Sequence, residues 1–388
     1  MPISSFTPAI TEKLSEQLGS IQLHRITPYI VTDINKITKN LDGFAQHLPD
    51  VGVYYAIKAN RDLPVLRAID SDVRGFDIAS LGELNLLMKI GIDPSRIFFS
   101  NPVKIPRHVK AAYKMGVRYY AFDSVNEIAK LAKYAPGSNV YLRLKVSDNG
   151  SKFPLSKKFG LDALYAADYC SLAQDAGLNV MGITFHVGSQ SENLQAWQTA
   201  IELVGKTIDS LEARDIHITM VNLGGGFPAD YGEPIPLLKD IAGCIKQAQK
   251  DFLPENVELM AEPGRYVVAN SSVMVTSVIG REHRSGSDWL YLDVGTFQGL
   301  IEPLEMPGWK YPVWSNKRAG GSDKSFVLTG PTCDAYDTIG FDYTLPSDLT
   351  VGDKIYIGAV GAYTSVYATR FNGFLPPKTY YIGLETNV

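Results

Sequence analysis

The segment 51–91, "VGVYYAIKANRDLPVLRAIDSDVRGFDIASLGELNLLMKIG", contains the repeating unit that decides the fold. The apolar runs "VGVYYAIK" (51–58) and "GFDIAS" (75–80) predict buried strands. The following "LGELNLLMKIG" (81–91) has apolar residues at helical spacing and a glycine where the helix would end. Similar signals alternate from about residue 27 to 270. Repeated strand–helix units predict a parallel (β/α)8 barrel, with an open doubly wound sheet as the less favoured alternative.

The pattern changes after about residue 270. Strand-like runs such as "KIYIGAVGAYT" (354–364) are separated by Gly, Pro, Ser and Asp, and helical periodicity almost disappears. We count "YIVTDI" (29–34) with the barrel strands, although the first strands of the chain could instead complete a β domain. The expected organisation is a barrel domain over 27–270 and a mostly β domain formed by 1–26 and 271–388.

The composition is that of a globular protein with a large core, since 45% of the 388 residues are hydrophobic and 20% are charged. A formal net charge of -4 lacks the basic character expected of a nucleic-acid-binding protein, and no apolar run is long enough to span a membrane. The N-terminal "MPISSFTPAITEKLSEQLGS" does not resemble a signal peptide. Cys170, Cys244 and Cys333 have no metal-type spacing. We therefore expect a cytoplasmic enzyme without a metal centre.

Polar residues or glycines occupy nearly every predicted strand end, where the functional residues of such barrels gather. These residues are Lys58, Asp77, Ser80, Glu83, Arg143, His186, Ser189, Gly224, Gly225, Gly226, Glu262, Gly264 and Arg265. Packing alone does not explain this regularity.

Each of these residues also has an ordinary structural explanation. Lys58, taken alone, is better explained as a snorkelling side chain than as an amine that forms a Schiff base. His186 could be an inert core histidine, and Asp77 could cap a helix or form an ion pair. Glu83 suits a helix N-terminus. Glu262, in the apolar "LMAEPGR", would be costly to bury without a cationic or protonated partner.

One ligand accounts for these groups together, namely pyridoxal 5′-phosphate (PLP). The backbone N–H groups of the triple glycine, with Ser189 and Arg265, would hold its phosphate. Glu262 would keep the pyridine nitrogen protonated, and His186 would stack on the ring. Lys58 would then be the lysine that binds the aldehyde, which reverses the preference for the snorkelling explanation.

With these residues in place, the sequence resembles the fold type III PLP-dependent decarboxylases, which act on ornithine, lysine, arginine or diaminopimelate. The resemblance covers nearly the whole chain. It rests on "YYAIKAN", "FDIASLGE", "FHVGSQ", "NLGGGFP", "AEPGR", "GPTCDAYD" and "GAYTSVYATRFNGF", in family order. It implies an alanine-racemase-like (β/α)8 barrel followed by a β domain of barrel or Greek-key type. It also implies a homodimer with active sites at the subunit interface.

The motif "GPTCDAYD" (330–337) places the chain nearest the ornithine branch, because diaminopimelate enzymes carry a Cys-Glu version. The resemblance implies that Cys333 assists protonation of the reacting carbon. It implies that Asp334 reaches across the dimer to the distal ammonium of a basic amino acid. It further assigns Tyr363 to the phosphate and Phe371 to the substrate pocket.

Four other positions also match family active-site positions. They are Asp77, Glu83, Arg143 and, in "KKFG", Lys158.

Substrate length depends on the segment after the "DVG" strand, where family members place an acidic residue. Here "DVGTFQGLIEPLEMPGW" (293–309) offers Glu302 and Glu305. Ornithine and lysine differ by one methylene, worth about 1–3 kcal/mol in a pocket. The expected reaction is therefore decarboxylation of L-ornithine to putrescine, with L-lysine to cadaverine as a second activity.

Several alternatives stay open. They are a lysine- or arginine-preferring decarboxylase, a diaminopimelate decarboxylase, an amino-acid racemase and a non-catalytic regulatory homologue. A racemase would use a tyrosine base and a neutral or arginine partner at the ring nitrogen, so Glu262 favours decarboxylation.

Overall fold

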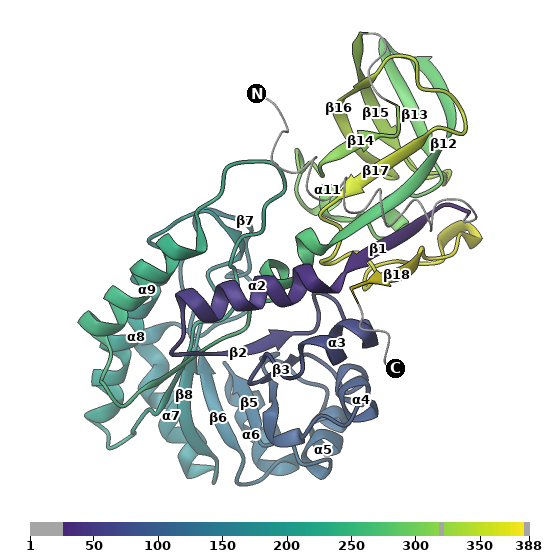
Figure 1. The fold of residues 1–388 in the computed structure, drawn as a ribbon. Helices are drawn as coiled ribbons and strands as arrows, with labels where there is room; N and C mark the ends of the chain where they lie inside the picture. Colours follow the sequence, from purple (N-terminus) through teal and green to yellow (C-terminus); the bar gives the residue numbers. More distant parts are fainter. Residues whose placement is uncertain (1–25, 318–321, 384–388) are drawn as a thin grey trace. The chain divides into compact units, whose positions relative to one another are not determined.

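A computed structural model describes residues 26–317 and 322–383 of the chain (Figure 1). The described residues form two compact units. One unit contains 37–228 and 235–267, and we call it the barrel unit. The other contains the described residues of 1–36, 229–234 and 268–388, and we call it the β unit.

The barrel unit is a closed barrel of eight parallel strands, as the strand–helix alternation predicts. The pairing of Leu259 with Val51 closes the barrel between its last and first strands. In barrel order the strands are β2 (Val51–Ala56), β3 (Gly75–Ile78), β4 (Ile97–Phe99), β5 (Tyr119–Phe122), β6 (Asn139–Arg143), β8 (Asn179–Thr184), β10 (Met220–Asn222) and β11 (Glu258–Ala261). A short antiparallel pair, β7 (Ser151–Phe153) with β9 (Ser189–Ser191), lies outside the barrel sheet.

Helices follow the strands and surround the barrel (Figure 1). They are α2 (Ile34–His47), α3 (Leu63–Ile69), α4 (Leu81–Lys89), α5 (Pro106–Lys114), α6 (Val125–Tyr134), α7 (Ala166–Asp175), α8 (Ala196–Glu212), α9 (Leu238–Phe252) and the short α10 (Arg265–Val268). Helix α4 begins where the Oγ atom of Ser80 accepts a hydrogen bond from the Glu83 N–H, and Gly91 follows its end with φ 85°. Side-chain capping and a left-handed glycine therefore delimit this helix.

Apolar side chains from successive strands fill part of the barrel interior. Phe98, Ala121, Tyr141, Met220 and Met260 form one buried cluster, one from each of β4, β5, β6, β10 and β11. Strands buried on both faces need such continuous apolar runs, which is why the sequence shows few alternating patterns there.

The β unit contains one eight-stranded sheet. Its strands are β1 (Tyr29–Asp33), β12 (Ser272–Arg284), β13 (Ser287–Leu292), β14 (Val313–Ser315), β15 (Asp323–Thr329), β16 (Thr338–Pro346), β17 (Lys354–Gly358) and β18 (Lys378–Ile382). The long β12 pairs with β1, β13 and β17. A short helix, α11 (Glu302–Glu305), interrupts the strands. The two-part fold class expected from the sequence, a (β/α)8 barrel plus a mostly β domain, is confirmed.

One expected barrel strand belongs to the other unit. The run "YIVTDI" forms β1, which pairs antiparallel with β12 and parallel with β18. Its burial pattern is that of any strand covered on both faces, so the sequence does not reveal which sheet it joins. Within the described residues, no helix is both long and apolar enough to cross a membrane.

Candidate active site

Lys58 and Asp77 meet at the carboxyl ends of adjacent barrel strands. Lys58 lies in the turn after β2, and its Nζ atom is 3.2 Å from the Oδ2 atom of Asp77, in β3. The Asp77 side chain is 3% exposed, whereas the Lys58 side chain is 43% exposed. A buried carboxylate therefore orients an amine that solutes can still reach.

Glu262 is the buried carboxyl of the site. It follows β11, is 7% exposed, and its Oε1 atom accepts hydrogen bonds from Ser100 Oγ at 2.5 Å and Asn222 Nδ2 at 2.6 Å. Burial, followed by the Asp77 carboxylate, raises the pKa of the Glu262 carboxyl, while Lys58 and the two hydrogen bonds lower it, and the net result is a pKa of about 7. This carboxyl can therefore exchange a proton near neutral pH.

His186 is a neutral ring. Burial, followed by the positive charges of Arg143 and Lys58, holds the pKa of His186 well below its usual range. Its Nδ1 atom accepts a hydrogen bond from the Gly188 N–H at 3.0 Å, so Nε2 carries the proton. A neutral, oriented imidazole suits stacking on a flat ring better than it suits an ion pair.

The triple glycine is required by close packing. A Cβ atom at Gly224 would lie 2.1 Å from the Phe185 carbonyl oxygen, and Gly224 itself has φ 64°. A Cβ at Gly225 would lie 2.9 Å from the Glu262 carbonyl oxygen and 3.1 Å from the Nε2 atom of His186. The end of β10 therefore passes directly over His186 and Glu262, where no side chain fits.

Arg265 and Ser189 supply further donors. Arg265 is almost fully buried, and its Nε atom donates to Ser189 Oγ at 3.1 Å. Its guanidinium lies over the ring of Phe153, with the central carbon 4.9 Å from the ring centroid. Packing on an aromatic ring fixes the direction of this guanidinium.

Glu83 has the ordinary role that its position predicts. Its Oε2 atom accepts a hydrogen bond from the Ala79 N–H at 2.6 Å at the start of α4, and burial raises its pKa. Arg143 and Lys158 lie on the ring of Phe159, at 5.4 Å and 5.2 Å from its centroid.

The predicted residues of the β unit lie in neighbouring loops. The backbone N–H and the thiol of Cys333 both approach the Oδ1 atom of Asn372, at 3.3 Å and 3.4 Å. Asp334 accepts a hydrogen bond from the Tyr336 N–H at 2.9 Å.

Two further predicted residues of this unit have aromatic neighbours. The ring of Phe371 is 4.6 Å from that of Phe297, and the ring of Tyr363 is 6.2 Å from that of Tyr367. The segments around 333 and 371 therefore come together within this unit.

The two acidic candidates for substrate length differ in environment. Glu302 is buried within the β unit, and its Oε2 atom accepts a hydrogen bond from the Tyr311 hydroxyl at 3.4 Å. Glu305, at the other end of α11, is exposed.

Comparisons with known proteins show the family of the chain. The family model described as "Pyridoxal-dependent decarboxylase, pyridoxal binding domain" matches residues 34–269. The chain belongs to this family. It is a PLP-dependent amino-acid decarboxylase.

Individual relatives cover nearly the whole decarboxylase. A lysine/ornithine decarboxylase of Selenomonas ruminantium is 38% identical over 365 residues, which are 93% of this chain and 91% of the relative. The crystal structure of SrLDC in complex with PLP and cadaverine has a TM-score of 0.87 and 35% identity, and covers 94% of this chain and 93% of that one. The lysine/ornithine decarboxylase of Vibrio vulnificus, complexed with cadaverine, has a TM-score of 0.88 and 29% identity, with 96% and 99% covered.

Three residues that contact the predicted ones were not predicted from the sequence. Ser100 and Asn222 bind Glu262, and Asn372 binds Cys333. Ser100 follows β4 and Asn222 ends β10, so the strand-end rule could have included both. Asn372 does not end a strand, but it lies in the motif "GAYTSVYATRFNGF" beside Phe371, so that motif could have pointed to it.

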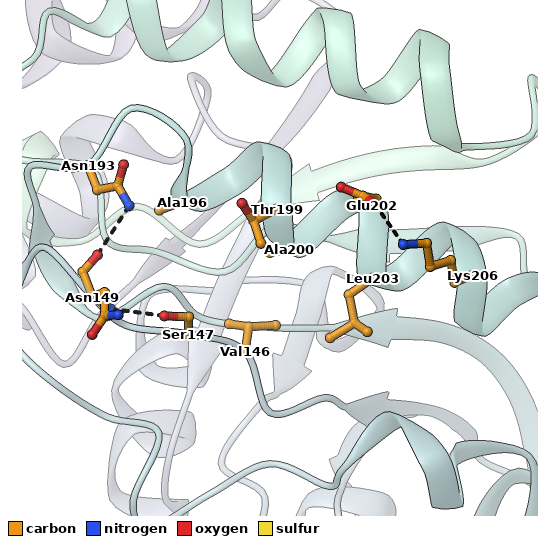
Figure 2. A pocket seen from close by; sticks show the side chains of 10 residues that line it. All are labelled: Val146, Ser147, Asn149, Asn193, Ala196, Thr199, Ala200, Glu202, Leu203 and Lys206. Carbon is orange, nitrogen blue, oxygen red and sulfur yellow. Dashed lines mark hydrogen bonds and ion pairs between the residues drawn. The ribbon is translucent and has the colours of Figure 1, made fainter.

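A separate pocket of the decarboxylase lies beside α8 (Figure 2). It has a volume of about 350 Å³, and none of the predicted site residues lines it. Two charged residues at this pocket pair with each other, since Lys206 Nζ donates to Glu202 Oε1 at 2.6 Å. Asn193 donates to the Asn149 carbonyl oxygen at 3.3 Å (Figure 2). This pocket therefore has none of the residues that we place in the active site.

Proposed function

We propose that this decarboxylase converts L-ornithine to putrescine and CO2, and L-lysine to cadaverine as a second reaction. The observation that carries the proposal is the group of an accessible lysine amine, a buried carboxyl with a pKa near 7 and a neutral histidine at one end of the barrel. The similarity to lysine/ornithine decarboxylases over most of the chain supports this substrate class. We also infer a cytoplasmic enzyme.

The residues present fit PLP. The close approach of β10 to His186 and Glu262 leaves no room for side chains on Gly224 and Gly225, so the backbone N–H groups there are bare. We assign the phosphate to the N–H groups of Gly224–Gly226 together with Ser189 and Arg265, and to Tyr363 by resemblance. Lys58 would hold the cofactor covalently. Gly264, which follows β11, packs closely on the turn that contains Lys58, since its Cβ would lie 3.0 Å from that of Ala59.

When bound, PLP withdraws electrons from the carbon that loses CO2. Glu262 would hold a proton on the ring nitrogen, and the His186 ring would keep the pyridine plane in place. Asp77 orients Lys58. Arg143 adds a fixed positive charge nearby.

The chain also supplies the proton that replaces CO2. The bond between the α-carbon and the carboxylate would break and leave its electron pair on the α-carbon. The S–H bond of Cys333 would then give its proton to that carbon, and the resulting thiolate would take a proton from water, to which Cys333 is exposed. Asn372 holds this thiol as a donor, because its Oδ1 atom accepts from Sγ. Phe371 would line the pocket.

The distal ammonium of the substrate needs carboxylates. We infer a homodimer in which Asp334 of one copy binds the ammonium of a substrate held by the other, as the resemblance implies. Of the two residues on α11, we assign Glu305 to the substrate, because Glu302 is held by Tyr311.

The test is CO2 release from purified protein supplied with PLP. Ornithine, lysine, arginine and meso-diaminopimelate are offered separately at equal concentrations. We expect turnover of ornithine and lysine, loss of turnover in Lys58→Ala, and normal turnover in the surface control Lys206→Ala, which also alters the pocket of Figure 2. Turnover of arginine or diaminopimelate alone, or an active Lys58→Ala variant, would refute the assignment.

A further inference from the structure

A chain of buried hydroxyl groups leads to Glu262. The Tyr141 hydroxyl, from β6, lies 2.8 Å from Ser100 Oγ, which lies 2.5 Å from the Oε1 atom of Glu262. Tyr141 and Ser100 are both buried. Tyr141 lies in the middle of β6, whereas Ser100 follows β4 and Glu262 follows β11, so only the closed barrel brings the three residues together.

The proton positions in this chain follow from counting. A serine hydroxyl has a single proton, which Ser100 donates to Glu262 Oε1. Ser100 can therefore only accept from Tyr141, so the Tyr141 hydroxyl must be the donor of that bond. Burial, with the nearby Glu262 charge second, raises the pKa of Tyr141 well above its usual value, which keeps this donor protonated.

The side-chain amide of Asn222 provides the second hydrogen bond to the Oε1 atom of Glu262. Its Nδ2 atom donates to Glu262 Oε1 at 2.6 Å, and its Oδ1 atom accepts from the Gly224 N–H at 2.9 Å, which defines the amide orientation. Oε1 therefore has two donors. Oε2 receives no hydrogen bond from any residue that the structure describes.

We propose that Tyr141 and Ser100 are positioning residues that act through Glu262, holding its Oε1 atom so that Oε2 is presented to the ring nitrogen of PLP. This inference rests on the proposed function. The two donors stabilise the ionised carboxylate, so the shared proton stays on the ring nitrogen rather than on Glu262.

Charged groups around Glu262 act on the same equilibrium. Asp77 on β3 favours the protonated carboxyl, whereas Lys58 after β2 favours the ionised one. Arg143 on β6 is also a cationic neighbour of Glu262, and His186 is neutral. Ser100 and Asn222 lower the pKa of Glu262, so loss of Ser100 moves the proton toward the carboxyl.

The experiment compares holoenzymes loaded with PLP labelled with ¹⁵N in the ring. The variants are Ser100→Ala, Tyr141→Phe and Ser100→Thr. Tyr120→Phe is the matched control, because it removes an equally buried hydroxyl that donates only to the Val117 carbonyl oxygen. The ¹⁵N chemical shift reports whether the ring nitrogen is protonated, and kcat and KM are measured for the better of ornithine and lysine.

In Ser100→Ala, we expect the ¹⁵N shift to move toward that of an unprotonated ring. We also expect kcat to fall about tenfold and KM to stay within about twofold, because a hydrogen bond to a charged group is lost away from the substrate. Tyr141→Phe should give a smaller change in the same direction. Ser100→Thr and Tyr120→Phe should keep the native shift.

A native ¹⁵N shift and native kcat in both Ser100→Ala and Tyr141→Phe would overturn the inference while leaving the proposed function intact. If Ser100→Ala does not fold, Tyr141→Phe decides, since it changes one atom. A native protein that binds no labelled PLP would overturn both, and this outcome is distinguishable from the first.

Discussion

Glu262→Gln should change the pH dependence of stability of the cofactor-free protein. The Glu262 carboxyl has a pKa of about 7 in the folded chain against 4.5 for the free side chain. That difference corresponds to about 3 kcal/mol of unfavourable burial of the ionised form. Glutamine has nearly the same shape and can accept the same two hydrogen bonds, but it carries no charge.

The direction of the change in stability with pH follows from which state, folded or unfolded, binds the Glu262 proton more tightly. Below pH 4.5 both the folded and the unfolded chain hold the Glu262 proton, so burial of this carboxyl carries no charge penalty. As the pH rises toward 7, the unfolded chain loses the proton first, and the free energy of unfolding falls. Above pH 7 both states are ionised, and the penalty of about 3 kcal/mol is complete.

The assay is urea unfolding of cofactor-free native and Glu262→Gln proteins at pH 5 and pH 8. The stability of Glu262→Gln relative to the native protein should rise by about 2–3 kcal/mol between these two values. Glu258→Gln is the matched control, because Glu258 lies on the same strand but its side chain is 58% exposed. It should show no comparable change.

With saturating PLP, the native protein should become more stable than Glu262→Gln, because only the carboxylate can hold the proton on the ring nitrogen. An equal difference between native and Glu262→Gln at both pH values, without PLP, would refute the burial argument.

Three further predictions concern packing at Gly225, the exposure of two thiols and the buried amine of Lys104. Gly225→Ala should weaken PLP binding by about 1–3 kcal/mol, measured by fluorescence titration of cofactor-free protein, because its Cβ would crowd the Glu262 carbonyl oxygen. Gly243→Ala, on open α9, should bind PLP normally, and equal affinities would contradict this explanation. Iodoacetamide should label exposed Cys333 well before buried Cys170, whose pKa burial raises to about 12, as measured by mass spectrometry; faster labelling of Cys170 would show that its site opens. Lys104→Met should destabilise the chain by about 1–3 kcal/mol in urea unfolding, because the Asn101 and Ala121 carbonyl oxygens lose a buried donor while Glu127 keeps Lys130 at 2.5 Å. The surface variant Lys206→Met should change stability by less than about 0.5 kcal/mol, and a similar small effect for Lys104→Met would contradict the prediction.

The periodicity of the sequence was enough to predict the barrel. Strands buried on both faces appear as short apolar runs, helices between them have a 3.6-residue repeat, and polar residues mark the strand ends. Lys58, Asp77, His186 and Glu262 could be chosen for this reason, since each is the polar residue that ends an apolar run.

Tertiary packing was needed wherever the partner is remote in sequence. The run 29–34 is equally apolar for either sheet, and only its pairing with β12 and β18 places it in the β unit. Ser100 and Glu262 are 162 residues apart, and no local pattern links them. The neutral state of His186 and the raised pKa of Glu262 likewise depend on burial and on neighbouring charges. Local periodicity shows where each strand ends and therefore which polar side chains lie there. The protonation and hydrogen bonds of these side chains depend on the residues that the closed barrel places beside them.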